Sequence, residues 1–141
     1  VDSDHAIEKK AGCSIKEIFE TKGEVHFRAL EKDFIDSGHA ASGQVVGCGG
    51  GLVIQPGIAD ILKSRGVVIC LFASIETIIE RTGRNRNRPL LEVEEREIEI
   101  RRLFKEREAI YLSSGTCIST DDRSLNDIIN HVIRVYRSQL D

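Results

Sequence analysis

Helical spacing governs the apolar positions near the start of the chain. Ser14 followed by Glu17 forms a capping-box pattern, which predicts a short helix that begins there and stops near Gly23. A second helix is expected to run on to Gly38, since its apolar residues recur every three or four positions. These residues are Phe27, Leu30, Phe34 and Ile35.

The middle of the chain alternates short apolar runs with another helical stretch. Residues 44–48 are expected to form a strand that breaks into a glycine triplet at residues 49–51, where the missing side chains allow a close approach by a ligand or another segment. Pro56 opens a helix that Gly66 ends. Residues 67–72 then form a continuous apolar run, which is typical of a buried parallel strand.

The second half of the chain continues this alternation. Ser74 is a candidate N-cap for a helix through Arg81. Residues 82–92 lose all periodicity and become rich in Gly, Asn and Arg, as in a surface loop. A densely charged helix is expected over 93–112, where opposite charges three and four positions apart support it, and a short strand over 116–120.

The last helix is amphipathic and completes the pattern. Ser124 is its expected N-cap, and its apolar residues are expected to face inward: Leu125, Ile128, Ile129, Val132 and Ile133. Strands that alternate with helices of this length imply right-handed crossover units. The expected fold is therefore α/β, a three-layer open parallel sheet with helices on both faces, in a single domain over residues 1–141. Such sheets bind ligands beyond the carboxyl ends of their strands.

Composition agrees with this fold class. The 141 residues are 40% hydrophobic and carry a net charge of -3, the profile of one ordinary globular domain. The longest apolar run, over residues 66–73, is too short to cross a bilayer, and no charged segment followed by an apolar one opens the chain. We therefore expect a cytoplasmic protein without membrane contact. The cysteines form no C-x-x-C pair, which indicates neither a zinc site nor a disulfide framework.

Charged residues mark two candidate sites. Asp2 and Asp4 alternate at the expected end of a strand, where one carboxylate can lie near a divalent cation and the other near a hydroxyl; carboxylates that cap the next helix give the same pattern. Most of the arginines lie between Arg81 and Arg107, around the expected loop, which suits recognition of phosphate or carboxylate. Salt bridges on a solvated helix explain several of them, but Arg88, which precedes a proline, fits that explanation less well.

Motifs spread along the whole chain resemble those of shikimate kinases. In order and spacing, they are Asp2-Ser3-Asp4, Ser14-Ile15 through Ile18-Phe19, Gly23-Glu24 with Phe27-Arg28 and Glu31, Gly49-Gly50-Gly51, Arg88-Pro89-Leu90-Leu91, Arg107 to Tyr111, and Ser119-Thr120. The resemblance implies the fold of the P-loop small-molecule kinases. It also implies transfer of the γ-phosphoryl group of ATP to the 3-hydroxyl of shikimate, on the way to chorismate and the aromatic amino acids, with Mg2+ required.

The resemblance assigns the substrate side of the site to matching residues. Asp4 matches the carboxylate that contacts the shikimate hydroxyl and acts as base, and Asp2 matches a carboxylate near Mg2+ through water. Arg28 and Arg107 match the arginines that grip the substrate carboxylate. The loop that approaches the ring is matched by Gly49, Gly50 and Gly51.

The nucleotide side of the site is assigned in the same way. Arg88 matches the catalytic arginine of a lid, at about residues 82–93, that reaches the phosphates. Arg81 matches the residue that stacks on adenine, and Arg123 matches, more loosely, another residue beside the base. Positioning and charge neutralisation are what phosphoryl transfer asks of a protein, and arginines, Mg2+ and a closing lid supply both. The family also implies a monomer.

The sequence departs from the family pattern at its N-terminal end. Shikimate kinases begin with a strand and a G-x-x-x-x-G-K-[ST] loop that holds the nucleotide phosphates, and no such pattern occurs in this sequence. Because the absent strand would leave two sheet edges unpaired, we expect these residues alone to fold poorly and to be inactive. Gly47 and Cys48 stand where many relatives carry a polar residue near magnesium, which leaves the details of metal binding open.

Two other functions stay open at this point. A non-catalytic module of the same fold would bind a small carboxylate or a protein partner through Arg28, Arg107 and the glycine triplet. Another small-molecule kinase, such as a gluconate kinase, shares the architecture but not the combination of lid, Phe-Arg and Gly-Gly-Gly motifs. Nucleic-acid binding is disfavoured, because the net charge is acidic and the arginines are not interleaved with aromatic residues.

Overall fold

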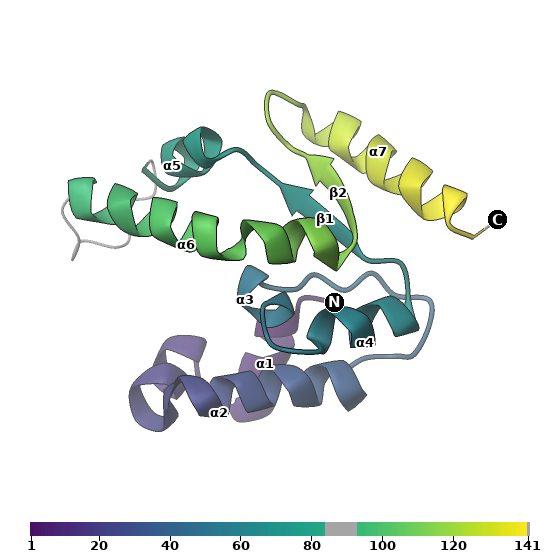
Figure 1. Ribbon diagram of the computed structural model, residues 1–141. Coiled ribbons are helices and arrows are strands. Elements are labelled where there is room, and N and C mark those ends of the chain that lie inside the picture. Colours follow the sequence, from purple (N-terminus) through teal and green to yellow (C-terminus); the bar gives the residue numbers. More distant parts are fainter. Residues whose placement is uncertain (84–92, 141) are drawn as a thin grey trace. The chain divides into compact units, whose positions relative to one another are not determined.

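The computed structural model describes residues 1–83 and 93–140 of the chain (Figure 1). These residues form two compact units, Val1–Arg65 and Gly66–Asp141. Each unit has its own helices and its own parallel backbone pairing. The units are therefore described one at a time.

The first unit opens with a short parallel pairing between its N-terminus and the segment before the glycine triplet. Asp2 and Gly47 form an isolated bridge, and the backbone N–H of Ser3 donates to the carbonyl of Gly47 at 2.9 Å. The N–H of Gly47 donates in turn to the carbonyl of Val1 at 2.8 Å. The predicted strand over residues 44–48 is thus too long, because only Gly47 pairs. The pairing stops after one bridge because the chain turns into a helix at Ser3.

Helices make up most of the rest of this unit. Helix α1 (Ser3–Ala11) is followed by α2 (Ile15–Ser37), which Ser14 and Glu17 begin with the predicted capping box. At Gly23 the backbone leaves the helical region, with φ of 80° and ψ of 172°, so α2 is two helices joined at this glycine. The predicted stop near Gly23 and the predicted end at Gly38, which is the C-cap, are both confirmed.

Two short helices complete the first unit. The glycine triplet is not the open loop that the sequence suggested, because Gly50 and Gly51 begin the short helix α3 (Gly50–Val53) with Gly49 as its N-cap. Helix α4 (Ile58–Arg65) follows, as predicted from the Pro-Gly pair before it. The apolar faces of these helices pack into one core, formed by Ile7, Ile18, Phe27, Phe34, Ile35, Leu52 and Ile58.

The second unit is built on two parallel strands, β1 (Ile69–Phe72) and β2 (Thr116–Ser119). Their register pairs Ile69 with Thr116 and Phe72 with Ser119. Helix α5 (Ile75–Gly83) follows β1, and α6 (Val93–Ser114) leads into β2, as predicted within two residues at each end. In Figure 1, α6 runs alongside both strands, and it contacts both.

The last helix, α7 (Leu125–Ser138), begins at the predicted cap, because the Oγ of Ser124 accepts from the N–H of Asp127. Ile128 and Val132 are half-buried, and α7 packs on β2. Leu125, Ile129 and Ile133 are instead 71%, 44% and 41% exposed. The prediction that these three face inward is wrong, because a two-stranded sheet is too narrow to cover the whole apolar stripe.

Candidate functional site

An arginine held by two carboxylates forms the centre of the site in the first unit. Nη1 of Arg28 donates to Oε2 of Glu31 at 2.8 Å, and its Nη2 and Nε donate to Oε1 of Glu24 at 3.0 and 3.2 Å. All three residues lie on α2, at the spacings that bring helix side chains together. The guanidinium is therefore fixed by residues of its own helix, and the Arg28 side chain is 24% exposed.

Glu31 is the buried member of this group. It is 2% exposed, and its Oε2 accepts from Nε2 of Gln55 at 2.8 Å as well as from Arg28. Burial raises the pKa of Glu31 above its ordinary value, and Arg28 opposes that rise. A buried carboxylate with two donors is satisfied, so Glu31 can anchor Arg28.

The glycine triplet lies against this arginine and against Asp4. A Cβ atom at Gly51 would come within 2.7 Å of Nη1 of Arg28 and 3.0 Å of its Nη2. A Cβ atom at Gly49 would lie 3.7 Å from both carboxylate oxygens of Asp4. Only glycine at residue 51 leaves the guanidinium where it is. The structure thus brings together Asp4, Arg28 and the triplet, three of the elements that the sequence selected.

Asp2 ends the extended segment that pairs with Gly47, and with Asp4 it also forms the start of α1. Oδ1 of Asp2 accepts from the N–H of His5 at 3.0 Å, so Asp2 is the N-cap of this helix. Asp4 lies in the first helical turn and is half-buried beside the buried Ser3. Within the described part of the chain, no cluster of three or more His, Cys, Asp or Glu side chains could hold a metal ion.

In the second unit, the predicted nucleotide residues gather at the carboxyl ends of the two strands. Nη1 of Arg81 donates to Oγ1 of Thr120 at 3.0 Å, and Nη2 donates to the Thr120 carbonyl at 3.0 Å. Asp121 accepts from the backbone N–H of Ser74, which lowers the pKa of Asp121 below its ordinary value. Arg81 is exposed and is held by hydrogen bonds at the strand ends, the position where open parallel sheets bind ligands.

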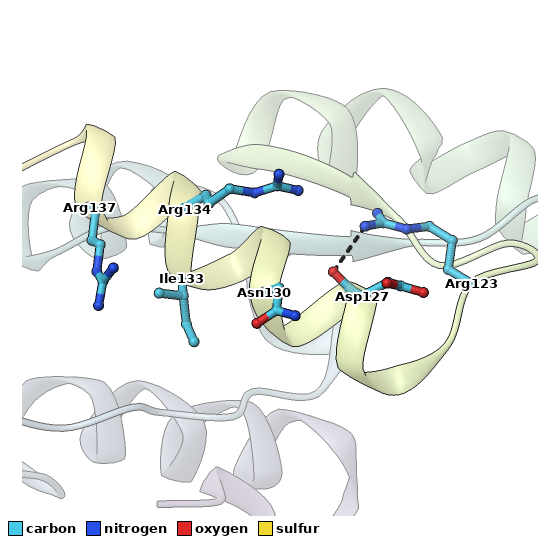
Figure 2. Close-up of a pocket in the computed structure, with 6 residues that line it drawn as sticks. All are labelled: Arg123, Asp127, Asn130, Ile133, Arg134 and Arg137. Atoms are coloured by element: carbon cyan, nitrogen blue, oxygen red, sulfur yellow. Dashed lines mark hydrogen bonds between the residues drawn. The ribbon is translucent and has the colours of Figure 1, made fainter.

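Arg123 joins the end of β2 to α7. Its Nη1 donates to the carbonyl of Ser119 at 3.0 Å and lies 3.0 Å from Nδ1 of His131, and its Nη2 donates to the carbonyl of Asp127 at 3.1 Å. Figure 2 shows this guanidinium at one end of an open pocket that follows α7. Arg123, Asp127, Asn130, Ile133, Arg134 and Arg137 line the pocket. It contains none of the other residues that the sequence selected, so we do not identify it with the reaction site.

Of the two remaining arginines, the structure describes Arg107 but not Arg88. Arg107 is half-buried on α6, where its positive charge helps to lower the pKa of Glu99. Arg88 and most of the lid predicted at residues 82–93 lie outside the described residues. The roles predicted for these arginines therefore stay predictions.

The sequence did not identify the full support of Arg28. Glu31 was part of the family motif, and its spacing of three from Arg28 is a usable signal for an ion pair. Gln55 is 24 positions away from Glu31, and no periodicity connects them. Their contact exists only because the turn after α3 brings Gln55 to the face of α2.

Parallel strand pairing and helical connections define an α/β protein. A family model described as "Shikimate kinase" matches residues 1–137. The chain belongs to the shikimate kinase family. This confirms the predicted family and the predicted α/β fold class.

Individual relatives agree with this assignment. A shikimate kinase of Caldanaerobacter subterraneus subsp. tengcongensis is 38% identical over 136 residues, which cover 96% of this chain and 80% of the relative. One of Acinetobacter baylyi is 38% identical over 139 residues, covering 98% of this chain and 77% of the relative.

Among the described residues, no helix is both long and apolar enough to span a membrane.

Solved structures lead to the same family. The structure of "Shikimate kinase from Acinetobacter baumannii in complex with shikimate" is similar to this one with a TM-score of 0.81 and 36% identity, covering 98% of this chain and 78% of that chain. The shikimate kinase from Aquifex aeolicus matches with a TM-score of 0.76 and 28% identity, covering 99% and 80%.

Proposed function

We propose that this protein transfers the γ-phosphoryl group of ATP to the 3-hydroxyl of shikimate. The observation that carries the proposal is the placement of Arg28, which a buried Glu31 holds against Gly51 while Asp4 lies beside Gly49. A guanidinium is the preferred partner of a carboxylate, and shikimate carries one. The same group of residues thus offers a cation for the substrate carboxylate and a carboxylate for its hydroxyl.

The chemistry asked of Asp4 is the acceptance of one proton. The shikimate oxygen forms a bond to the γ-phosphorus as the bond from that phosphorus to the β,γ-bridging oxygen breaks, and ADP leaves with the bridging electrons. The hydroxyl proton passes to Asp4, whose half-buried position beside the glycine triplet suits a base. Arg28 orients the substrate by its far end, so that the hydroxyl meets Asp4.

We also propose that Mg2+ accompanies ATP, with Asp2 as a ligand through water. Magnesium keeps several waters and uses one or two carboxylates together with substrate phosphates, and Asp2 can supply one such carboxylate. Bound Mg2+ neutralises phosphate charge during transfer. Asp2 is exposed and offers a carboxylate oxygen in addition to the one that caps α1.

For the nucleotide side, we propose contacts from the second unit and the lid. Arg81 would stack on adenine and Arg123 would lie beside the base, while Arg88 would reach the transferring phosphoryl group. Arg107 would bind the substrate carboxylate from its half-buried position on α6. Hydrogen bonds to Thr120 limit the side-chain freedom of Arg81, which lowers the entropy cost of ordering it on a ligand.

The test is shikimate-dependent ADP release in the presence of Mg2+ and ATP. It is measured with this chain and with the same chain together with any residues that its reading frame encodes ahead of Val1. Asp4→Asn should lower the rate at least 100-fold, within the range that general-base catalysis contributes. Asp33→Asn is the matched control, because Asp33 is an exposed carboxylate on α2 whose partner is Lys10.

The outcomes separate the two classes of function. Shikimate-dependent ADP release that Asp4→Asn lowers at least 100-fold and Asp33→Asn retains supports the kinase. Shikimate binding by calorimetry with no ADP release from either form would replace the kinase by a non-catalytic binding module. Release that depends on gluconate and not on shikimate would move the protein to another small-molecule kinase class.

A further inference from the structure

Oε2 of Glu31 is shared by two donors that come from different parts of the first unit. Arg28 reaches it from one helical turn earlier on α2, and Gln55 reaches it from the turn between α3 and α4. Both contacts are 2.8 Å, and Glu31 itself is 2% exposed. The two contacts therefore hold one buried oxygen in place, and through it the guanidinium of Arg28.

The backbone around Gln55 makes this second contact well defined. The N–H of Gln55 donates to the carbonyl of Leu52 at 3.2 Å, and the carbonyl of Gln55 accepts from the N–H of Ile58 at 3.2 Å. Leu52 and Ile58 both belong to the buried core of the unit. Gln55 is thus anchored on both sides, and its amide reaches Glu31 from a fixed backbone.

The charges that face Glu31 explain why a second donor is useful. Arg28 is the cation that faces it, whereas Glu24 on α2 and Asp4 on α1 are anions, and the Cys48 thiol also lies close enough to interact with it. Burial and the carboxylate of Asp4 both favour protonation of Glu31. A protonated Glu31 would lose most of its attraction for Arg28. The neutral N–H donor of Gln55 stabilises the negative charge of Glu31 and leaves Arg28 as the group that binds the substrate carboxylate.

We propose that Gln55 is a positioning residue for shikimate, which acts by keeping Glu31 in place and thereby Arg28 aligned on the substrate carboxylate. The proposal rests on the proposed function, because it needs Arg28 to bind that carboxylate. Gln55 itself does not touch the substrate in this proposal. Its side chain stabilises the residue that fixes the binding group.

The experiment measures the shikimate dissociation constant by calorimetry between pH 5 and 8, and the titration of Glu31 by carbon NMR of its carboxyl group. Gln55→Met keeps the length of the side chain and removes the donor, and Gln55→Glu places an acceptor there. Gln55→Lys restores a donor. Gln44→Met is the control, since it removes the same amide from an exposed position whose partner is the backbone of Ala40.

Gln55→Met should weaken shikimate binding roughly tenfold at pH 7.5, the effect of losing one hydrogen bond to a charged group. The pH below which affinity falls should move upward, together with the titration of Glu31, because a donor to the carboxylate has been lost. Gln55→Glu should show a larger effect in the same direction. Gln55→Lys and Gln44→Met should bind within twofold of the unsubstituted chain.

Thermal unfolding of each variant identifies any loss that comes from misfolding. Should Gln55→Met fail to fold, Gln55→Glu and Gln55→Lys still give opposite expectations for affinity. Unchanged affinity and an unchanged Glu31 titration in Gln55→Met and Gln55→Glu would overturn the role of Gln55 while leaving the proposed function intact. Absence of shikimate binding in the unsubstituted chain would instead count against the proposed function, and the Glu31 titration would still report on the contact with Gln55.

Discussion

Replacement of Gly51 by alanine should separate substrate binding from stability. The added Cβ would lie 2.7 Å from Nη1 of Arg28 and 3.2 Å from its Cζ, whereas uncrowded contacts to carbon begin near 3.5 Å. The guanidinium must therefore move by about 0.8 Å, the difference between the normal and the available distance. Because the atoms that move are the end of a flexible side chain, the fold can absorb the change.

The expected loss in the Gly51→Ala variant concerns affinity. A displaced Arg28 would forfeit one charge-assisted hydrogen bond to its ligand, worth about 1.5–3 kcal/mol, which corresponds to roughly 10- to 100-fold weaker shikimate binding. The free energy of unfolding should change by less than about 1 kcal/mol, since alanine is also the better helix former in α3.

Calorimetric titration with shikimate, paired with thermal unfolding, tests both parts. Gly66→Ala is the control, because nothing lies within 4 Å of a Cβ at that position. Equal affinity of the Gly51→Ala variant and the unsubstituted chain would refute the placement of Arg28. A large drop in melting temperature in this variant would show that its backbone, and not only a side chain, is crowded.

Three further predictions concern stability. Burial raises the pKa of Glu31, so the stability linked to its protonation is fully present below the ordinary pKa of 4.5 and is lost as the pH rises through the pKa of the folded state. The difference in unfolding free energy between the unsubstituted chain and Glu31→Gln, measured in urea, should therefore fall from pH 4 to pH 7. A rise would show that ion pairing outweighs burial. Gly115→Ala should lower the unfolding free energy by about 1–3 kcal/mol, because its Cβ would overlap the backbone carbonyl of Val68, and an unchanged melting temperature would contradict this. Ser14→Ala should cost about 1 kcal/mol by removing the cap that Glu17 completes, whereas Ser64→Ala, outside any helix start, should cost less in the same melts.

Local signals in the sequence predicted most of the helices correctly. Ser14 and Ser124 start helices where their hydroxyls accept from the backbone three residues later, and Gly23 and Gly38 end them. These features depend on contacts within a few residues, so the sequence contains all that is needed to find them. The two parallel strands of the second unit were also identified, because their apolar runs are short and lie between clear helical patterns.

Features that depend on distant contacts were predicted less well. The strand over residues 44–48 is reduced to one bridge, since its extent depends on how long its partner stays extended before α1 begins. The inward face of α7 was overestimated, because periodicity identifies an apolar stripe but not the width of the sheet that covers it. The helix α3 within the glycine triplet was missed for a related reason. Glycine disfavours helix in general, and only tertiary packing at Leu52 fixes it here.

The arrangement around Arg28 shows why a family motif can identify a site before its mechanism of support is known. The family motif contains Arg28, Glu31 and the glycine triplet in a recognisable order. It does not reveal that the Arg28 guanidinium leaves no room for a side chain at residue 51. The structure supplies that reason, and it adds Gln55, whose amide completes the support of Glu31 from outside the motif. Another side chain could give the same support if it brought a hydrogen-bond donor to that oxygen. The Gln55→Lys variant therefore tests whether the site requires a particular side chain at this position or only a donor to Glu31.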